Sequence, residues 1–593
     1  MLKTHSCGEL RSEHIGQTVT LAGWVNRRRD MGGVIFIDLR DRGGKAQVVV
    51  DSGRTPAGFA AAEGVRSEYV VQVTGVVSPR PPGQENPNMP TGEVEVLAEQ
   101  VTVLNSARTT PFPVDRDDAV DETTRLRYRY LDLRRERLQR NLMLRHNAIK
   151  FIRDFLNERG FIEVETPILF KSTPEGARDY LVPSRVHPGK FYALPQSPQQ
   201  LKQLLMVAGY ERYFQIARCF RDEDLRADRQ PEFTQLDMEM SFVERDDVLN
   251  LIEELMVGMV KAVSLVPLAY EQFPRLSYAE ATERFGTDRP DLRYGMELVS
   301  IADIVGNSAF RVFAENVAAG KPVKAICAPG CATYSRKQLD ELEQMARTQG
   351  AKALAWLAIQ PDTGEIRGPI AKFFTVDQLI AITERLNAGP GDLILISSDT
   401  KAVVHNALSA LRTELARRLG YADKKELAFA WVIDFPLFEE ELEDGHFAPS
   451  HHMFTSPKPE HVSLLDTNPA AVLSQQYDLV CNGFEVAGGS IRIHDQELQA
   501  KIMSLIGFSM EQARDQFGHL LEAFEFGAPP HGGIAPGIDR LVALMAGEPN
   551  IREVMAFPKT AQATDLMADA PSHVLQRQLD ELQLAIKVKS GQV

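Results

Sequence analysis

The sequence predicts an α+β protein with a small N-terminal β-barrel and a larger α+β domain that a second α+β domain interrupts. Residues 1–104 contain short β-rich runs between glycine- and proline-rich turns. Residues 141–289 and 424–558 carry dense charged motifs beside strand-like runs, whereas residues 290–423 lack such motifs. A chain of 593 residues is also too long for one hydrophobic core, so several domains are expected.

Five β-rich runs account for most of the first 104 residues: 19–25, 34–39, 46–50, 69–77 and 93–103. Five short strands separated by turns are typical of a small closed barrel, of which the OB fold is the common nucleic-acid-binding example. Phe36 and Gln47 lie in two of these runs. An aromatic ring can stack on a base and an amide can read a base edge. An equally good interpretation places Phe36 in the core with its neighbours Ile35 and Ile37.

The next segments alternate between connector, helix and strand patterns. Residues 105–140 form a connector that ends in an arginine-rich stretch. Apolar residues at positions 144, 148, 151 and 155 then repeat at helical spacing, which predicts a helix that ends at Gly160. Residues 161–165 alternate as a strand and stop before Pro167. Further helices are predicted at 336–347, 376–386, 401–419 and, in the extension over 559–593, at 575–586.

The net charge of −15 argues against general nucleic-acid binding, but two stretches are basic. Residues 24–45 hold six basic and three acidic side chains, and residues 125–145 hold eight arginines and two acids. Local basic stretches on an acidic protein favour a specific RNA partner, and the alternative is a pair of salt-bridged, solvated faces. The sparse cysteines, Cys327 and Cys331 included, are interpreted as ordinary thiols. Without a signal peptide or a long apolar run, the chain is expected in the cytoplasm with no membrane contact.

No phosphate loop of the G-x-x-x-x-G-K-S/T type is present, so nucleotide phosphates would need another set of cations. Three segments supply them: RGFIEVETPIL at 159–169, FRDE with FTQLDME at 220–239, and GIAPGIDR at 533–540. These resemble motifs 1, 2 and 3 of the class II aminoacyl-tRNA synthetases. Residues 173–179, 220–235 and 483–493 also resemble the bacterial aspartyl-tRNA synthetases, and this resemblance covers nearly the whole chain.

The resemblance implies a domain order and an activity. It implies an OB-fold anticodon-binding domain (1–104), a hinge (105–140), a catalytic domain in two parts with a six-stranded antiparallel sheet (141–289 and 424–558), a bacterial-type insertion (290–423) and an extension (559–593). The implied activity is an aspartate–tRNA ligase, in which ATP and L-aspartate give aspartyl-adenylate and pyrophosphate. The aspartate then passes to the 3′ end of tRNA(Asp). Motif 1 further implies a homodimer.

The resemblance also implies roles for individual residues. Arg221 and Arg540 are the expected catalytic residues, at the α- and γ-phosphates, where a guanidinium suits phosphate oxygens. The Mg²⁺ ligands are expected to be Asp478 and Glu485, because this cation prefers oxygen. The implied ATP-binding residues are Arg221, Asp222, Glu223, Gln230, Glu485, Gly537, Ile538, Asp539 and Arg540.

For aspartate, the implied binding residues are Glu175, Gln199, Lys202, Arg221, Asp237, His451 and Arg492. Lys202 and Arg492 would select the side-chain carboxylate, because a neutral amide would leave desolvated cations unpaired. Asp237 would offset part of the cost of burying Lys202. His451 would close over the substrate.

Several positions depart from the commonest pattern of this family: Gln200 with Leu201, Met453, Ala487 and Pro536. None removes a charged group. The methyl group of Ala487 is the departure expected to matter, because it could alter the loop between Glu485 and Arg492.

For the tRNA, the residues implied in anticodon reading and tRNA discrimination are Arg29, Met31, Phe36, Gln47, Gly83 and Glu93. At position 31, strict family members carry leucine and relaxed members carry histidine, so Met31 matches neither. The proline-rich loop 79–90 looks more like that of relaxed members. We therefore hypothesise relaxed discrimination, with tRNA(Asn) charged as well.

Two other interpretations stay open. One is a class II synthetase for asparagine or lysine, although the Lys202 and Arg492 pair would repel a cationic side chain. The other is a non-catalytic RNA-binding paralogue. Such a protein could lose Arg221, Arg540 or the Mg²⁺ carboxylates, and all of these are present.

Overall fold

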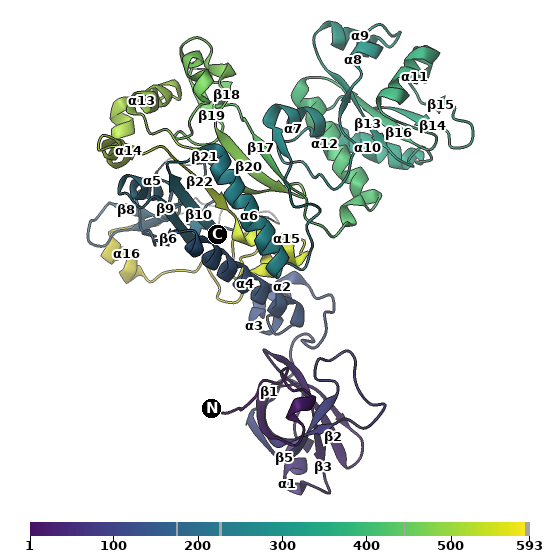
Figure 1. Cartoon of the computed structure of the whole chain (residues 1–593), viewed down its shortest axis with the longest axis vertical. Helices are drawn as coiled ribbons and strands as arrows, with labels where there is room; N and C mark the ends of the chain where they lie inside the picture. Colours follow the sequence, from purple (N-terminus) through teal and green to yellow (C-terminus); the bar gives the residue numbers. More distant parts are fainter. Residues whose placement is uncertain (174–175, 225–227, 444, 588–593) are drawn as a thin grey trace. The chain divides into compact units, whose positions relative to one another are not determined.

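The computed structural model describes residues 1–173, 176–224, 228–443 and 445–587. It divides the chain into two compact units, Met1–Met143 with Arg552–His573, and Leu144–Ile551 with Val574–Val593. Their elements are labelled in Figure 1. Among the described helices, none combines the length and the apolar character that a membrane span requires.

The first unit begins with a closed five-stranded barrel in the order β1-β2-β3-β5-β4. The strands are β1 (Thr18–Asp30), β2 (Val34–Asp41), β3 (Gly44–Asp51), β4 (Val70–Pro79) and β5 (Val94–Asn105). Strand residues alternate between a buried and a more exposed face, and valine, isoleucine and leucine fill the interior. The predicted barrel is confirmed, with strand positions close to the expected runs. The sequence pattern missed the short helix α1 (Pro56–Glu63).

The rest of the first unit contains α2 (Glu122–Arg127), α3 (Arg129–Asp132) and the start of α4 (Glu136–Glu158). Its arginines are largely bonded within the unit. Arg125 donates to Asp132 at 3.1 Å and to Glu553 at 2.7 Å, and Arg129 donates to Asp132 at 2.6 Å. For these arginines the salt-bridged interpretation of the second basic stretch holds, because their charge is compensated by buried carboxylates.

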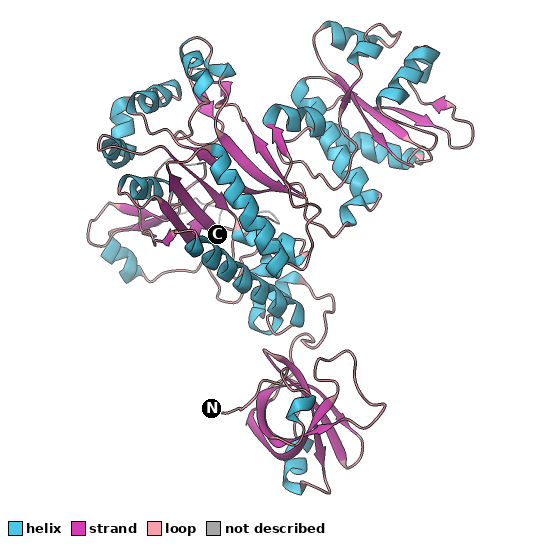
Figure 2. Ribbon diagram, in the orientation of Figure 1, coloured by secondary structure: helices cyan, strands magenta, loops and turns pink. Residues whose placement is uncertain are grey.

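The second unit is built on an eight-stranded sheet, ordered β11-β17-β20-β21-β22-β10-β9-β6 (Figure 2). The six central strands pair antiparallel: β17 (Phe429–Ile433), β20 (Gln476–Cys481), β21 (Phe484–Ile491), β22 (His531–Pro536), β10 (Glu232–Ser241) and β9 (Arg212–Phe220). The two edge strands, β11 (Arg275–Ser277) and β6 (Ile162–Glu163), are short and parallel to their neighbours. The expected six-stranded antiparallel sheet is therefore present, with one short strand added on each edge.

Helices and two small two-stranded sheets surround this sheet. The helices are α5 (Gln199–Val207), α6 (Arg245–Val263), α7 (Tyr278–Phe285), α13 (Gln496–Leu505), α14 (Met510–Phe524) and α15 (Ile538–Ala546). The short strands β7 (Leu181–Pro183) and β8 (Phe191–Ala193) pair with each other, as do β18 (Phe438–Glu441) and β19 (Phe447–Pro449). The helix predicted up to Gly160 is α4, and its apolar stripe is buried at Leu144, Ala148 and Phe155. The strand predicted over 161–165 is shorter than expected, since only Ile162 and Glu163 pair.

The segment between β11 and β17 forms a separate five-stranded sheet, ordered β12-β13-β16-β14-β15. Its strands are β12 (Val299–Ser300), β13 (Val323–Ala328), β14 (Ala355–Ile359), β15 (Ile366–Arg367) and β16 (Leu393–Ser398). Its helices are α8 (Ala302–Val305), α9 (Arg311–Ala318), α10 (Arg336–Thr348), α11 (Val376–Arg385) and α12 (Lys401–Arg418), the last three as predicted. The C-terminal helix α16 (Gln576–Leu582) is shorter than the predicted 575–586. The exact domain boundaries stay predictions.

Candidate active site

One cavity of about 730 Å³ lies in the second unit, over the central strands of the main sheet. All four cations expected to bind substrate line it: Lys202, Arg221, Arg492 and Arg540. Other predicted site residues in its wall are Gln199, Glu223, Gln230, Asp237, His451, Glu485, Gly537 and Asp539. Of the remaining predictions, Asp222, Asp478 and Ile538 are not in the wall, and Glu175 lies outside the described residues.

At one end of the cavity, Lys202 and Arg492 are buried beside two carboxylates of β10. The Lys202 Nζ atom lies 2.7 Å from Asp237 Oδ1 and 3.3 Å from Glu239 Oε2. Arg492 donates from Nε to Glu239 Oε1 at 2.9 Å and from Nη2 to Glu239 Oε2 at 3.2 Å. All four side chains are at most 2% exposed, so two positive and two negative charges form a neutral buried cluster. Burial of this kind is tolerated only when every charge is paired.

The two carboxylates of this cluster differ in their environment. Burial raises the pKa of Asp237, against the pull of Lys202. Burial has the same tendency at Glu239, but Arg492 and Lys202 override it and hold the pKa of Glu239 below its usual value. Asp237 Oδ2 is buried and has no hydrogen-bond partner among the described residues. This oxygen is therefore a ready acceptor for a substrate ammonium group.

Glycine at position 533 makes room for Glu239. A Cβ atom on Gly533 would lie 2.0 Å from Glu239 Oε2 and 2.2 Å from the Met238 carbonyl oxygen. No side chain fits there without displacing the carboxylate that holds Arg492. The glycine of the third motif thus serves the buried charge cluster.

Two neighbouring histidines cover the same end of the cavity. His452 Nε2 lies 2.6 Å from Arg492 Nη1, and His451 Nδ1 lies 3.4 Å from Thr455 Oγ1. Burial, followed by the positive charge of Arg492, lowers the pKa of His451 to about 3. Burial and His451 lower the pKa of His452 as well. Both rings are therefore neutral at pH 7 and add no charge to the cluster.

The cavity wall also contains the two arginines expected at the phosphates. The Arg221 guanidinium lies over the Phe233 ring, 5.1 Å from its centroid, and its Nε has no partner among the described residues. Arg540 donates from Nη1 to the Glu485 carbonyl oxygen and from Nη2 to Asp228 Oδ2 at 3.0 Å. Stacking and a backbone contact fix both guanidinium groups while leaving donors for an anion.

Asp478 on β20 and Glu485 on β21 converge above Gly488. A Cβ atom on Gly488 would lie 3.3 Å from Asp478 Oδ1, 3.4 Å from Glu485 Oε1 and 3.8 Å from His451 Nε2. Burial, followed by the charge of Glu485, raises the pKa of Asp478 well above its usual value. Two neighbouring carboxylates, of which Glu485 lines the cavity, are the donor set of a hard divalent cation that takes its other ligands from phosphates and water. These residues therefore fit a divalent metal ion.

Three predicted ATP residues make contacts within the protein. Asp539 accepts the Thr234 backbone N–H at 2.7 Å and also bonds Arg145. The Asp222 backbone N–H donates to the Arg178 carbonyl at 3.0 Å. Ile538 is buried as the first residue of α15. Gly537 lines the cavity, and a Cβ there would contact only the Val486 carbonyl oxygen at 3.8 Å, so a side chain would enter the cavity.

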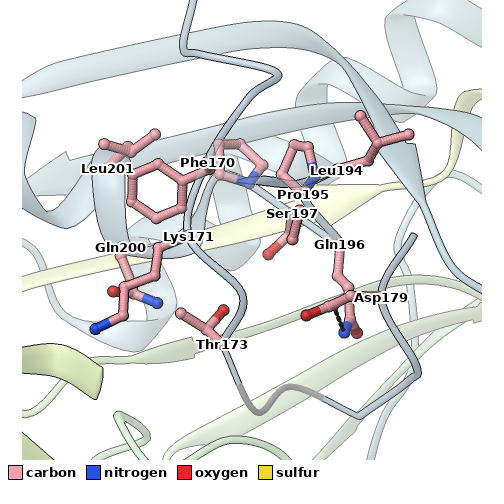
Figure 3. A pocket seen from close by; sticks show the side chains of 12 residues that line it. Phe170, Lys171, Thr173, Asp179, Leu194, Pro195, Gln196, Ser197, Gln200 and Leu201 are labelled. Atoms are coloured by element: carbon pink, nitrogen blue, oxygen red, sulfur yellow. Dashed lines mark hydrogen bonds between the residues drawn. The ribbon is translucent and has the colours of Figure 1, made fainter. Parts of the chain in front are cut away.

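Sequence reasoning missed Glu239, His452 and Gln196. Glu239 follows Asp237 by two positions on β10, and this spacing places both side chains on one face of a strand, so the signal was present. Gln196 had no such signal. It bonds both backbone groups of Ala177, at 3.0 and 2.7 Å, and Asp179 at 2.6 Å. Gln196 lines the cavity, and Figure 3 shows its bond to Asp179 in a second pocket that Gln196 also lines.

Two of the unusual residues face each other across the sheet. Ala487 on β21 pairs with Pro536 on β22, and both are buried. Proline has no backbone N–H, so this pair contributes one donor fewer to the ladder. Met453 lines the cavity and packs with Phe454, Met503 and Phe517. The methyl of Ala487 lies in the cavity wall, and the charged residues on either side of it keep their contacts.

On the barrel of the first unit, Phe36 is half-buried on the outer face and does not belong to the core. The Arg29 guanidinium lies 5.7 Å from the centroid of its ring and donates to Gln47 Oε1 at 3.2 Å. Gln47 in turn donates to Glu95 Oε2 at 2.9 Å. The other residues predicted to discriminate tRNA, Met31, Gly83 and Glu93, are exposed. Glu95 belongs to this chain of contacts and was not predicted from the sequence.

Comparisons with known proteins agree with this architecture. Residues 121–561 match the family model of the class II tRNA synthetases for D, K and N, and residues 19–104 match the OB-fold nucleic acid binding domain. The aspartate–tRNA(Asp/Asn) ligase of Dehalococcoides mccartyi is 54% identical over 99% of this chain and 100% of its own length. That of Moorella thermoacetica is 57% identical over 98% and 96%. The aspartate–tRNA ligase of Geobacillus kaustophilus is 54% identical over 99% of each chain.

Solved structures share the fold at low identity. The asparaginyl-tRNA synthetase of Pyrococcus horikoshii, complexed with asparaginyl-adenylate, matches with a TM-score of 0.59 and 20% identity over 94% of this chain and 99% of its own. The aspartyl-tRNA synthetase of Entamoeba histolytica matches with 0.58 and 19%, over 94% and 91%. The class II synthetases are enzymes that use ATP and divalent metal ions. The chain belongs to this class and, within it, to the bacterial aspartate–tRNA ligases.

Proposed function

We propose that this protein activates L-aspartate with ATP and Mg²⁺ and transfers it to the 3′ end of tRNA(Asp). The observation that carries the proposal is the shared cavity. Lys202, Arg492, Arg221 and Arg540 all line it. This arrangement can hold an acidic amino acid and a triphosphate side by side.

In the first step, an oxygen of the aspartate α-carboxylate attacks the α-phosphorus of ATP. The bond from that phosphorus to the bridging oxygen breaks, and pyrophosphate leaves. Arg221 stabilises the charge that builds on the α-phosphate, and Arg540 holds the γ-phosphate. A magnesium ion held by Asp478 and Glu485 would neutralise further phosphate charge when bound. In the second step, a terminal hydroxyl of the tRNA attacks the carbonyl carbon of the adenylate, and AMP leaves.

Selection of aspartate over asparagine follows from the buried cluster. Lys202 uses two of its three N–H donors to contact Asp237 and Glu239. Arg492 uses most of its donors to contact Glu239, Ser490 and His452. The remaining donors require a full carboxylate, because an asparagine amide would point its own N–H groups at them. Discrimination of about 10⁴-fold or more is typical of sites that depend on a matched polar partner.

An ATP–pyrophosphate exchange assay across amino acids tests this proposal. Exchange with aspartate, and almost none with asparagine or lysine, is expected. Equal exchange with asparagine would overturn the aspartate assignment. Arg221→Ala should abolish exchange while tRNA binding persists. If tRNA binding persisted in a wild-type protein that had no exchange activity, the non-catalytic paralogue would be the better interpretation.

Relaxed tRNA choice also belongs to the proposal. The Dehalococcoides and Moorella relatives are named for both tRNA(Asp) and tRNA(Asn), and the proline-rich loop 79–90 points the same way. Charging of a purified tRNA(Asn) transcript with aspartate is expected, and no product would end this part of the proposal.

We also propose a homodimer in the cytoplasm, where ATP, aspartate and tRNA are found. Apolar side chains of the motif 1 segment are exposed on the isolated chain: Ile162, Ile168 and Leu169 at 48, 39 and 50%. Exposed apolar patches of this kind mark interfaces. A monomeric sedimentation profile at micromolar concentration would contradict the dimer.

A further inference from the structure

Asp539 lies in the wall of the cavity, yet both of its oxygens are already bonded within the protein. Oδ2 accepts the Thr234 backbone N–H at 2.7 Å, and Oδ1 accepts the Arg145 guanidinium. The side chain is only 4% exposed. A buried carboxylate whose two oxygens each accept a protein donor, and that carries the same sign of charge as a triphosphate, is a poor ligand for ATP.

Arg145 extends the same contact to a second element. Its Nη1 bonds Asp539 on α15, and its Nη2 donates to Thr234 Oγ1 on β10 at 3.0 Å. Arg145 itself belongs to α4. Three elements therefore meet at one planar guanidinium, which bonds its two partners from two separate nitrogen atoms. A lysine has a single nitrogen in place of this fork, so it would not keep the same geometry at both contacts.

The two phosphate-binding arginines extend from either side of this junction. Arg540 is the residue after Asp539 on the first turn of α15. Phe233, over whose ring Arg221 lies, is the residue before Thr234. The first turn of α15 has no side-chain cap at Gly537, so Asp539 is the side chain that ties it to the neighbouring strand.

We propose that Arg145 and Asp539 are positioning residues for ATP: they lock α15 to β10 and so fix the separation of Arg540 and Arg221. The inference rests on the proposed function. A displacement of about 1 Å at a catalytic group can cost about 100-fold in rate. The bonds of Arg145 and Asp539 described above include none to Lys202, Asp237 or Arg492, so the effect of both residues should fall mainly on ATP.

Arg145→Lys is the first test, with Arg347→Lys as the matched control. Arg347 forms a surface pair with Glu343 on α10, 2.7 Å long, and has no contact with the cavity. The kcat/KM for ATP in pyrophosphate exchange should fall about tenfold to 100-fold in Arg145→Lys. The KM for aspartate should change less than about twofold, and the control should match wild type. An unchanged kcat/KM for ATP, or equal losses for ATP and aspartate, would overturn the inference.

Asp539→Asn tests whether Asp539 positions α15 or acts on ATP directly through its negative charge. The amide keeps an acceptor for Thr234 but loses the ion pair with Arg145. If Asp539 acted only as a negative charge near the triphosphate, its removal would strengthen ATP binding. The proposal expects the opposite, a higher Kd for ATP by calorimetry on the full chain. Tighter binding would overturn it.

A double-mutant cycle with Arg540→Ala asks whether Arg145 acts through Arg540. The fold-losses in ATP affinity of Arg145→Lys and Arg540→Ala should not multiply in the double variant. The position of α15 matters little once Arg540 has been removed. Fully multiplicative losses would overturn the proposal. Calorimetry does not require aminoacylation. If wild type failed to exchange with aspartate while Arg145→Lys still weakened ATP binding, the proposed function would fail and this inference would stand.

Discussion

At the scale of single residues, four buried charged side chains give the cavity its selectivity and also make the fold sensitive to mutation: Lys202, Asp237, Glu239 and Arg492. Each charge is tolerated because another lies within about 3 Å of it. Removal of one member leaves an uncompensated buried charge. The same groups that would recognise aspartate therefore also hold the central strands together.

Lys202→Met should destabilise the protein as well as inactivate it. The substitution leaves Asp237 as an unpaired buried carboxylate, whereas Glu239 keeps Arg492. Loss of one partner of a buried pair costs about 3–5 kcal/mol. Urea unfolding followed by tryptophan fluorescence measures the change. Lys261→Met is the control, because Lys261 is 54% exposed and pairs with Glu271 at the surface. If Lys202→Met changed the free energy of unfolding by less than about 1 kcal/mol, loss of a positive charge from the cluster would not destabilise the fold.

Asp478 should make the metal-free protein less stable as the pH rises. Burial and Glu485 raise its pKa in the folded state. The folded protein then keeps a proton that the unfolded chain has lost above about pH 4, so the free energy of unfolding falls as the pH increases through this window. Asp478→Asn removes the titrating group, and its unfolding midpoint in urea should decline less between pH 4 and 7 than that of wild type.

Mg²⁺ provides the matching control for Asp478. It should offset the decline in wild type by neutralising the two carboxylates, and it should have little effect on Asp478→Asn. If wild type and Asp478→Asn had the same dependence of the unfolding midpoint on pH without metal, the raised pKa of Asp478 would not be the cause of the decline.

At the scale of elements, periodicity predicted what is regular and missed what depends on distant partners. The five barrel runs and the helices α10, α11 and α12 follow from alternation and helical spacing. The length of β6 could not be predicted, because an edge strand ends where its neighbour stops pairing. Arg221 and Lys202 were found by motif resemblance. Gln196 was missed, because its role comes from a loop that the fold brings to it.

The helix α14 contains a glycine that the fold does not need. Gly518 lies in the middle of α14, and a Cβ atom there would have no neighbour within 4 Å. Glycine inside a helix costs about 0.5–1 kcal/mol relative to alanine. Gly518→Ala should therefore raise the melting temperature while pyrophosphate exchange stays at the wild-type rate. Gly160→Ala, at a φ of +76°, should lower it. A destabilised Gly518→Ala would mean that α14 needs this glycine for a contact not formed by the isolated chain.

At the scale of the whole molecule, two tasks are assigned to separate units, and they should be separable by mutation. The adenylate cavity lies in the second unit. The outer face with Phe36, Arg29 and Gln47 lies in the first. Amino-acid activation needs no tRNA in the proposed mechanism, so a defect on the barrel face should affect transfer alone.

Phe36→Ala tests this separation. A base stacked on an aromatic ring contributes about 1–3 kcal/mol, so the KM for tRNA(Asp) should rise about fivefold to 150-fold. Pyrophosphate exchange without tRNA should keep its wild-type kcat and KM, because Phe36 is not among the residues that line the cavity. Glu63→Gln, at the exposed end of α1, serves as the barrel control. If Phe36→Ala lowered exchange and charging equally, the barrel face would act on the fold or on activation, and its assignment to anticodon reading would be lost.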